Sequence, residues 1–449
     1  MSGDLFEIAD LVIAGAKGDE QVEAYVTHSR ETQVRVYEGE VEQLSVAEGM
    51  GVGVRVVRAG RQGFAYCGTF DAESVRAAVD DARDNAAFAE PDEWAGVAEP
   101  DGVEPADLDL WRDDLLDVPT DRKVAIAVEL EHALRSVDPR ITGVESCDYG
   151  DSAGEVVVAT TSGIRRAART TGCELVSYAL ADDEDGSSQT GFGFSVGRTF
   201  DELDVDAAAA DAARRATRML GAVKPKSAKL TVVLDPWVSA QLLGIVAGTL
   251  SAEEVVKGRS LFADRVGEQV AAASVTLVED PTDPRSWNAS PIDDEGLACR
   301  RVPLIQDGVL GGFVHSGWTA RRMGTASTGS AMRGGFKTTP AAGCRSVSLV
   351  PGAAAPDDLI AGIDDGVLIQ EVSGLHSGVN PVSGDVSTGA QGLRIRDGAV
   401  AEPLREFTLA STVQRLLHDV VAIGSDLTWL PMSAAGITLV ITDVSISGQ

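Results

Sequence analysis

Regular alternation of apolar and polar residues between Val22 and Tyr66 constrains the fold of this chain more than any other feature of its sequence. Valines recur at every second position over 34–36 and over 52–56, and the runs are separated by Glu38-Gly39 and Ala59-Gly60. A period of two is typical of strands with one buried face, and glycine after a polar or small residue favours a tight turn. The segment therefore predicts an antiparallel meander.

Helices and a second set of strands are expected around this meander. Apolar residues at helical spacing predict helices over 4–16, 70–89, 121–137 and 201–220, and the three prolines within 90–109 predict an irregular connection. Residues 141–196 predict short strands broken by glycines. Helices packed on antiparallel sheets give an α+β class.

The C-terminal half predicts a β-rich domain of mixed or antiparallel sheet with helices. We expect a buried strand over 230–234, a helix over 237–250, short strands and turns over 308–398, a last helix over 409–417 and a last strand over 437–444. A chain of 449 residues is too long for one ordinary core. We therefore expect an N-terminal α+β domain over 1–225, in pieces of about 1–90 and 110–225, and a second domain over 226–449.

Charge and cysteine usage exclude several classes of function. The chain has 69 acidic and 38 basic residues and a formal charge of −31, which repels phosphate backbones, so we expect no direct nucleic-acid binding. The first residues lack the basic start of a signal peptide, and no apolar run is long enough for a membrane span. Five scattered cysteines without a C-x-x-C pair are typical of reduced thiols in a cytoplasmic protein.

No motif of a single-chain hydrolase is present in the sequence. The five histidines are far apart and form no zincin pair; they are His28, His132, His315, His376 and His418. The stretch over 327–331 does not match the G-x-S-x-G pattern of serine hydrolases. We expect no metal ligand and no catalytic residue in this chain.

The stretch SGLHSGVNPVSGD, residues 373–385, is the segment most like a binding site. It places a histidine, an asparagine, an aspartate and several serines and glycines between two apolar strands. One interpretation is a long turn in which glycines and Asx side chains shape the backbone. The other is a loop that contacts a peptide or a partner. The candidate residues are His376, Ser377, Gly378, Asn380, Ser383 and Asp385.

Several longer stretches resemble one family. GLHSGVNPVSGDVSTGAQGLRIRDGAVAEPLREFTLA, followed by LLHDVVAIGSDL, resembles the C-terminal signature of PmbA/TldE proteins. RETQVRVYEGEVEQ with GMGVGVRVVRAGRQGFAY resembles the N-terminal domain of the TldD/PmbA family, and KGRSLFADRVGEQVAAASVTLVEDP, DDEGLACRRVPLIQDGVL and TASTGSAMRG resemble its C-terminal domain. The resemblance covers most of the chain in the right order.

The sequence departs from the zinc-binding members of that family. TldD-type subunits carry H-E-x-x-x-H on the helix after the first C-terminal strand and a cysteine near the C-terminus. Here the alignment places Gly244, Ile245 and Thr249 at the first histidine, the glutamate and the second histidine, and Ile423 at the cysteine. These side chains cannot hold zinc or activate its water.

The resemblance implies a subunit that works with a partner. PmbA/TldE chains pair with a TldD-type metallopeptidase subunit, and the heterodimer degrades unstructured peptides or removes leader segments from peptide natural products. The partner would supply zinc and the catalytic base. This chain would bind no cofactor itself and would form half of a chamber and part of its peptide-binding wall.

Two other functions stay open on the residues alone. One is a standalone homodimeric enzyme with a non-zinc site built from His376, Asp385 and His315. The other is a binding protein without a protease partner, since family members were once described as modulators of DNA gyrase. A TldD-like reading frame beside this one would favour the subunit.

Overall fold

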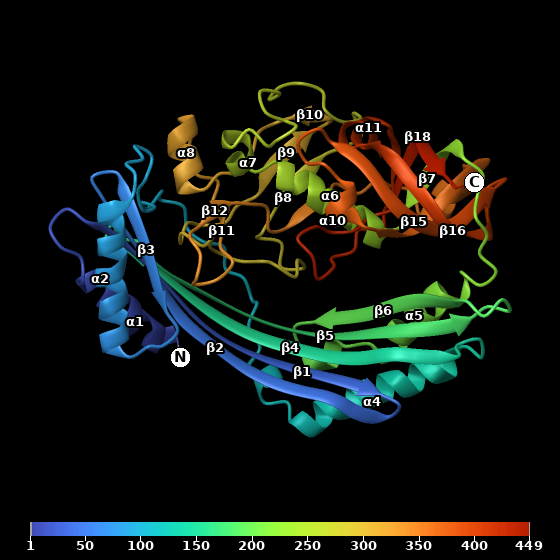
Figure 1. Ribbon diagram of the computed structural model, residues 1–449, viewed down its shortest axis with the longest axis horizontal. Helices are drawn as coiled ribbons and strands as arrows, with labels where there is room; N and C mark the ends of the chain where they lie inside the picture. The colour runs from blue at the N-terminus through green and yellow to red at the C-terminus, as the bar shows by residue number, and fades with distance from the viewer. Residues whose placement is uncertain (1, 449) are drawn as a thin grey trace.

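The computed structural model describes residues 2–448 and has the predicted α+β class. The elements of the first half are α1 (Ser2–Ala14), β1 (Gln21–Tyr37), β2 (Glu40–Arg58), β3 (Arg61–Cys67), α2 (Ala72–Phe88), α3 (Asp113–Leu116), α4 (Thr120–Val137), β4 (Gly143–Thr160), β5 (Arg165–Asp182), β6 (Ser188–Gly197), η1 (Phe200–Glu202) and α5 (Val205–Thr217). Figure 1 shows that the first six strands form one long curved sheet.

The predicted meander is the first half of this sheet, whose order is β3-β2-β1-β4-β5-β6 with antiparallel neighbours throughout. Glu38-Gly39 and Ala59-Gly60 are its two-residue turns, and all four residues have positive φ. Such backbone angles belong to type I′ turns, whose twist matches that of paired strands. The two predicted sets of strands thus join side by side through β1 and β4.

Glycines do not break β4, β5 and β6 into short strands, which corrects the expectation for residues 141–196. The strands run for 18, 18 and 10 residues. Gly191 and Gly193 lie within β6 because α5 packs directly on them: a Cβ there would come within 2.3 Å of Ala212 O or 2.0 Å of Ala208 O. These glycines allow a close approach of helix to sheet, a role that glycine has in strands as well as in turns.

Helices cover the convex face of the first sheet. α1 and α2 share one apolar core with the near part of β1, including Val22, Ala24 and Val26. α4 and α5 share another with the far part, including Val34 and Val36. The opposite, concave face is turned toward the C-terminal half of the chain (Figure 1).

The C-terminal half contains a second six-stranded sheet, of order β16-β15-β14-β7-β18-β17. Its elements are β7 (Ala228–Leu234), α6 (Pro236–Thr249), α7 (Ala252–Val256), β8 (Leu277–Glu279), β9 (Val302–Gln306), β10 (Val309–Leu310), α8 (Gly317–Met323), β11 (Ala331–Met332), β12 (Ala341–Ala342), β13 (Val347–Leu349), α9 (Pro356–Ala361), β14 (Asp365–Ser373), α10 (Leu375–Gly378), β15 (Asp385–Arg396), β16 (Ala399–Thr412), α11 (Val413–His418), β17 (Val420–Ile423) and β18 (Leu439–Ser447). β14 and β7 are parallel, and β16 also pairs with β18, so five of the strands close into a ring.

Two predicted helices begin later than expected. Residues 409–412 belong to β16, which pairs with β15 and β18, and α11 starts only after Thr412 caps it by accepting a hydrogen bond from Arg415 N. The helix predicted from residue 201 is a short 3-10 turn followed by α5, whose N-cap is Asp204. In both places a polar cap sets the boundary that apolar spacing alone does not locate.

The described part of the chain has no helix that is long and apolar enough to cross a membrane. All five cysteines are free thiols. The first sheet uses residues before 198 and the second uses residues after 227, while the predicted division into two domains at 225 stays a prediction.

Candidate functional site

The concave face of the first sheet lines a cavity of about 450 Å³ below the C-terminal half. Thr27, Ser152 and Arg169 border it from three strands of the sheet, and Trp287 and Asn288 border it from a C-terminal loop. A second cavity of about 240 Å³ lies further along the same face. Arg35 of β1 lines this second cavity, eight residues beyond Thr27.

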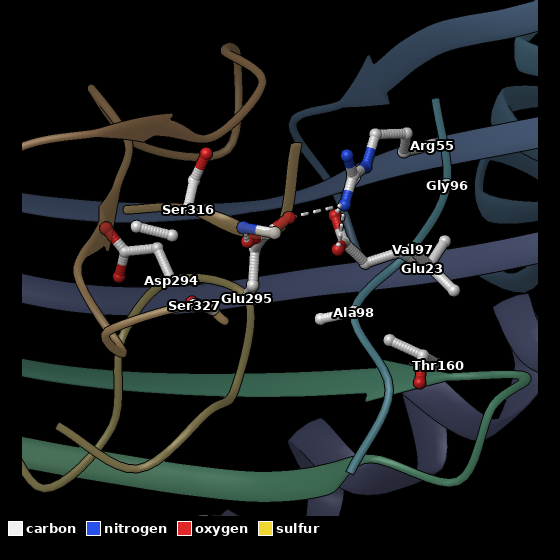
Figure 2. Close-up of polar contacts among 12 residues, drawn as sticks. Glu23, Arg55, Gly96, Val97, Ala98, Thr160, Asp294, Glu295, Ser316 and Ser327 are labelled. Atoms are coloured by element: carbon white, nitrogen blue, oxygen red, sulfur yellow. Dashed lines mark hydrogen bonds and ion pairs between the residues drawn. The ribbon is translucent and has the colours of Figure 1, made fainter. Parts of the chain in front are cut away.

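A buried ionic junction joins the two halves at one end of the sheet (Figure 2). Arg55 on β2 lies between two carboxylates: its Nη2 is 2.5 Å from Glu23 Oε2 on β1 and 3.1 Å from Glu295 Oε1 in a C-terminal loop. Arg333 forms a further ion pair with Glu23. None of these four side chains is more than 4% exposed.

Electrostatics keep this junction ionised. Burial acts to raise the pKa of Glu23, but the guanidinium groups of Arg333 and Arg55 outweigh it and lower that pKa below its usual value. Burial acts to lower the pKa of Arg55, and the carboxylates of Glu23 and Glu295 raise it instead. Glu295 also accepts a hydrogen bond from Gly317 N at 2.7 Å, which ties α8 to the same cluster.

The loop that carries Glu295 is fixed by neighbouring carboxylates. Asp293 accepts hydrogen bonds from the backbone N–H groups of Glu295, Leu297 and Ala331. Burial and the nearby charge of Glu295 raise the pKa of Asp293 above its usual value. Asp294 accepts a hydrogen bond from the hydroxyl of Tyr25 on β1 at 3.3 Å.

An aromatic junction joins the halves at the other end of the sheet. Trp237, at the start of α6, packs on Phe192 and Phe194 of β6 with ring centroids 4.5 Å and 5.4 Å away. Asp235 caps α6 by accepting a hydrogen bond from Trp237 N, and it also forms an ion pair with Arg215 of α5 at 3.2 Å. α6 is thereby placed over the concave side of the sheet.

α6 carries three of the four positions at which the resemblance places a degenerate zinc motif. Gly244 and Ile245 lie on a half-exposed side of the helix, and the position of a Cβ on Gly244 would be 3.7 Å from Ser433 Oγ. Thr249 is buried, and its hydroxyl donates a hydrogen bond to Val246 O at 2.6 Å. Only the first two positions are therefore accessible from the surface.

Ile423, the fourth position, ends β17 and is buried in the same apolar core as Leu243 and Val246 of α6. None of the four side chains offers the nitrogen, thiolate or carboxylate that zinc needs, so these positions do not fit the metal. Across residues 2–448, no group of three or more His, Cys, Asp and Glu side chains is arranged to hold a metal ion.

The predicted binding loop connects β14 with β15 and uses much of its polarity to hold its own shape. The side-chain oxygen of Asn380 accepts hydrogen bonds from Val382 N and Ser383 N, and Asp385 Oδ2 accepts one from the Ser383 hydroxyl at 2.7 Å. Gly378 belongs to the one-turn helix α10, and the Ser377 hydroxyl donates to Gly374 O. These contacts are those of the turn interpretation.

The side chain of His376 lies outside the described part of the structure, so its role stays a prediction. Asn380, Ser383 and Asp385 are nevertheless exposed at the surface. The predicted peptide or partner contact through this loop also stays a prediction.

His315, invoked for a standalone hydrolase, is a buried residue. Burial lowers the pKa of its imidazole, and its Nδ1 has no hydrogen-bond partner among residues 2–448. Asp385 is therefore not bonded to that nitrogen, which a catalytic His–Asp pair would require there.

Sequence reasoning did not single out the residues of the two junctions. Glu23 and Arg55 each interrupt a valine-rich strand, and a charge in a buried strand needs a buried partner. That signal was available, although the partners Glu295 and Arg333 lie far along the chain and carry no local signature.

Comparison with known proteins identifies the family that this chain resembles. Models of PmbA/TldA metallopeptidase domain 1, central domain and C-terminal domain match residues 22–86, 113–220 and 227–448, respectively. These matches follow one another in the order of the family, along most of the chain.

Individual relatives match over most of their length as well. The chain is 26% identical to the metalloprotease PmbA of Escherichia coli O157:H7 over 98% of this chain and 94% of that protein. It is also 26% identical to a metalloprotease TldD homolog of Haemophilus influenzae, over 83% and 79%. Among solved structures, TldE from Thermococcus kodakarensis superposes with a TM-score of 0.90 and 25% identity, covering 99% of this chain and 100% of that one.

Proposed function

This chain belongs to the PmbA/TldD metallopeptidase family, and from that membership we propose that it is the zinc-free subunit of a two-chain metallopeptidase. A TldD-type partner supplies zinc and the catalytic base, and the complex cleaves unstructured peptides or removes peptide leader segments. We also propose the cytoplasm as its location, in keeping with five free cysteines.

The residues on the half-exposed side of α6 carry this proposal, because none of them can bind zinc. The helix is well formed, correctly capped and held over the concave face, but Gly244 and Ile245 stand on its half-exposed side. A hydrolytic zinc site needs about three protein ligands and a base beside the metal-bound water. The resemblance implies that α6 corresponds to the zinc-binding helix of TldD-type subunits, and Gly244, Ile245 and Thr249 supply none of the ligands.

The concave face suits an extended peptide. Thr27 borders the first cavity and Arg35 the second. The two residues are eight positions apart on one strand, which is roughly 26 Å at the usual strand rise. A folded substrate is too wide for cavities of this size, whereas an unfolded segment can follow the strand. In this proposal the chain binds and orients the peptide, and the loop over 374–385 contributes from the second sheet.

Reconstitution tests the proposal. The purified chain should hold no stoichiometric zinc and cleave no unfolded peptide, while its mixture with the TldD-type subunit of the same organism should elute as one complex and cleave an unstructured peptide. Such an interface should bury on the order of 2,000 Å² or more. About one tightly held zinc per chain, or separate elution at micromolar concentration, would refute it.

A matched pair of controls separates assembly from chemistry. Removing zinc from the partner should abolish cleavage and leave the complex assembled, because no zinc ligand comes from this chain. Gly244→His alone should not create activity in the chain by itself, since Ile245, Thr249 and Ile423 still offer no ligand.

A further inference from the structure

More than half of β2 forms a free edge of the first sheet. β2 pairs with β1 from Glu40 to Val57, but β3 pairs with it only from Val52 onward. Residues 40–51 thus have β1 on one side and no strand of the described chain on the other. This edge is roughly 40 Å long at the usual strand rise. Figure 1 shows β2 running beyond β3 along the outside of the sheet.

An exposed apolar row accompanies this edge. Val41, Leu44 and Val46 are 43%, 47% and 57% exposed. They lie opposite the buried residues Val36, Val34 and Thr32 of β1, and directly opposed residues of an antiparallel pair point to the same face. The row is therefore on the helix-covered face, next to the core shared by α4 and β1 but not covered by it.

Lysine and proline, two common protections of an edge strand, are missing here, and the irregularity of β2 is one bulge between Val41 and Gln43. Natural edges are blunted by lysine, proline or covering segments because their free N–H and C=O groups pair readily with another chain. Residues 38–50 contain no lysine, arginine or proline. By contrast, α2 packs against β3, and the side-chain amide of Asn85 donates a hydrogen bond to the backbone carbonyl of Phe64 at 3.0 Å.

Charge decides which kind of strand fits. Glu38, Glu40 and Glu42 lie along the first part of this segment, and Glu48, which contacts His28 Nε2 at 2.7 Å, lies near its end. A second copy of the same chain would bring these carboxylates together along one seam. Like charges opposed across strands are destabilising. An incoming strand with lysine or arginine between apolar residues would instead pair with the carboxylates and cover Val41, Leu44 and Val46.

We propose that the β2 edge over residues 40–51 receives an extended strand of alternating apolar and basic residues from a different polypeptide, the second subunit of the complex. The strand adds to the sheet by main-chain hydrogen bonds, and its apolar side chains extend the core beside α4. That the second subunit provides this strand rests on the proposed function. The alternation of apolar and basic residues is inferred from the apolar and acidic side chains of β2 alone.

A binding experiment tests the chemistry without the partner. The probe is a short dye-labelled peptide of alternating valine and lysine, with a valine–glutamate peptide for comparison. The lysine peptide should bind, and Val46→Lys should weaken its binding about tenfold or more by repelling it from the edge. The matched control is Val421→Lys, because Val421 is also 57% exposed but lies on β17 in the second sheet; it should bind like the unsubstituted chain.

Three outcomes would overturn the proposal: no binding of the lysine peptide, equal binding of both peptides, or equal weakening by both substitutions. If the unsubstituted chain is a dimer that Val46→Lys dissociates, the occupant is a second copy and the charge argument is wrong.

The TldD-type subunit then separates this proposal from the proposed function. If a complex forms and Val46→Lys weakens it relative to Val421→Lys, the edge is the docking surface. If the complex forms with equal affinity for both variants, the docking surface is wrong and the proposed function stands. If no complex forms with the unsubstituted chain, the proposed function fails, and the peptide result alone decides the chemistry of the edge.

Discussion

The two junctions both hold the halves of the chain together, one by ion pairs and the other by aromatic contacts. At one end Arg55 lies between Glu23 and Glu295 with almost no solvent access, and at the other Trp237 rests on Phe192 and Phe194. Ion pairs are directional, and a displaced charge loses its partner in a place without water. Aromatic contacts weaken gradually when rings shift. The ionic end therefore fixes the register of the halves, and the aromatic end tolerates small movements of α6.

Removing the central cation should have the largest effect. Arg55→Met leaves Glu23 and Glu295 buried without their shared partner, so the free energy of unfolding should fall by about 3–5 kcal/mol. Arg58→Met is the control, since Arg58 is 61% exposed and pairs with an exposed Asp19; it should change stability by less than about 0.5 kcal/mol. Chemical denaturation of both variants measures the difference, and equal losses would contradict a special role for the ionic end.

The pH dependence of stability gives a second test near the ionic end. Burial raises the pKa of Glu279, which accepts hydrogen bonds from Arg345 N and Ser346 N, to about 7. Because the folded-state pKa lies above the unfolded value, the stabilising contribution is complete below about pH 4.5 and is lost as the pH rises through about 7.

The change across this window is on the order of 3 kcal/mol, at about 1.4 kcal/mol per pKa unit. Glu279→Gln cannot titrate, so its unfolding free energy should fall less between pH 4.5 and 7 than that of the unsubstituted chain. Parallel pH profiles for the two proteins would rule out this titration.

Truncating the aromatic end should have a smaller effect. Trp237 is half-buried, so Trp237→Ala should lower the free energy of unfolding by about 2 kcal/mol, less than the loss of a fully buried ring. Phe88→Ala, at a 90% exposed side chain, is the control and should be nearly neutral. A Trp237→Ala loss larger than that of Arg55→Met would reverse the comparison between the junctions.

The smallest effect on stability is expected in the predicted binding loop, residues 374–385. Asn380→Ala removes an acceptor for Val382 N and Ser383 N and should lower stability by about 1 kcal/mol, since these donors can turn to water. With the partner present, His376→Ala should lower kcat/KM without changing the melting temperature, because binding energy is lost without loss of packing. If kcat/KM is unchanged in both Asn380→Ala and His376→Ala, the loop is a turn without a role in binding.

The first half of the fold could be predicted because its signals are local. Glu38-Gly39 and Ala59-Gly60 make hairpins from their own backbone preferences, and the meander follows. The prediction of short, glycine-broken strands was wrong at Gly191 and Gly193, because these glycines allow α5 to pack closely on β6, a tertiary contact that local sequence does not show. Leu409 was assigned to a helix because strand pairing on both sides is invisible in its neighbours.

The residues of the candidate site were harder to predict from the sequence than the fold. The placement of Gly244 and Thr249 at zinc-ligand positions rests on the resemblance and stays a prediction. The junctions could not be predicted, because Arg55 and Glu295 are 240 residues apart. A charge inside a valine-rich strand predicts that a partner exists and does not say where it lies. The polar loop was found by composition, which cannot distinguish a side chain that binds from one that shapes a turn.

The position of β18 in the second sheet has a consequence for protein synthesis. β18 lies between β7 and β17, and Lys229 of β7 pairs with Asp443 of β18 across 214 residues. At usual translation rates, roughly 10–40 seconds separate the emergence of β7 from that of its neighbour. The first sheet is synthesised long before then, so for that interval the nascent chain carries a complete front half joined to an apolar strand that still lacks its neighbour. A holding chaperone has its natural target in that interval.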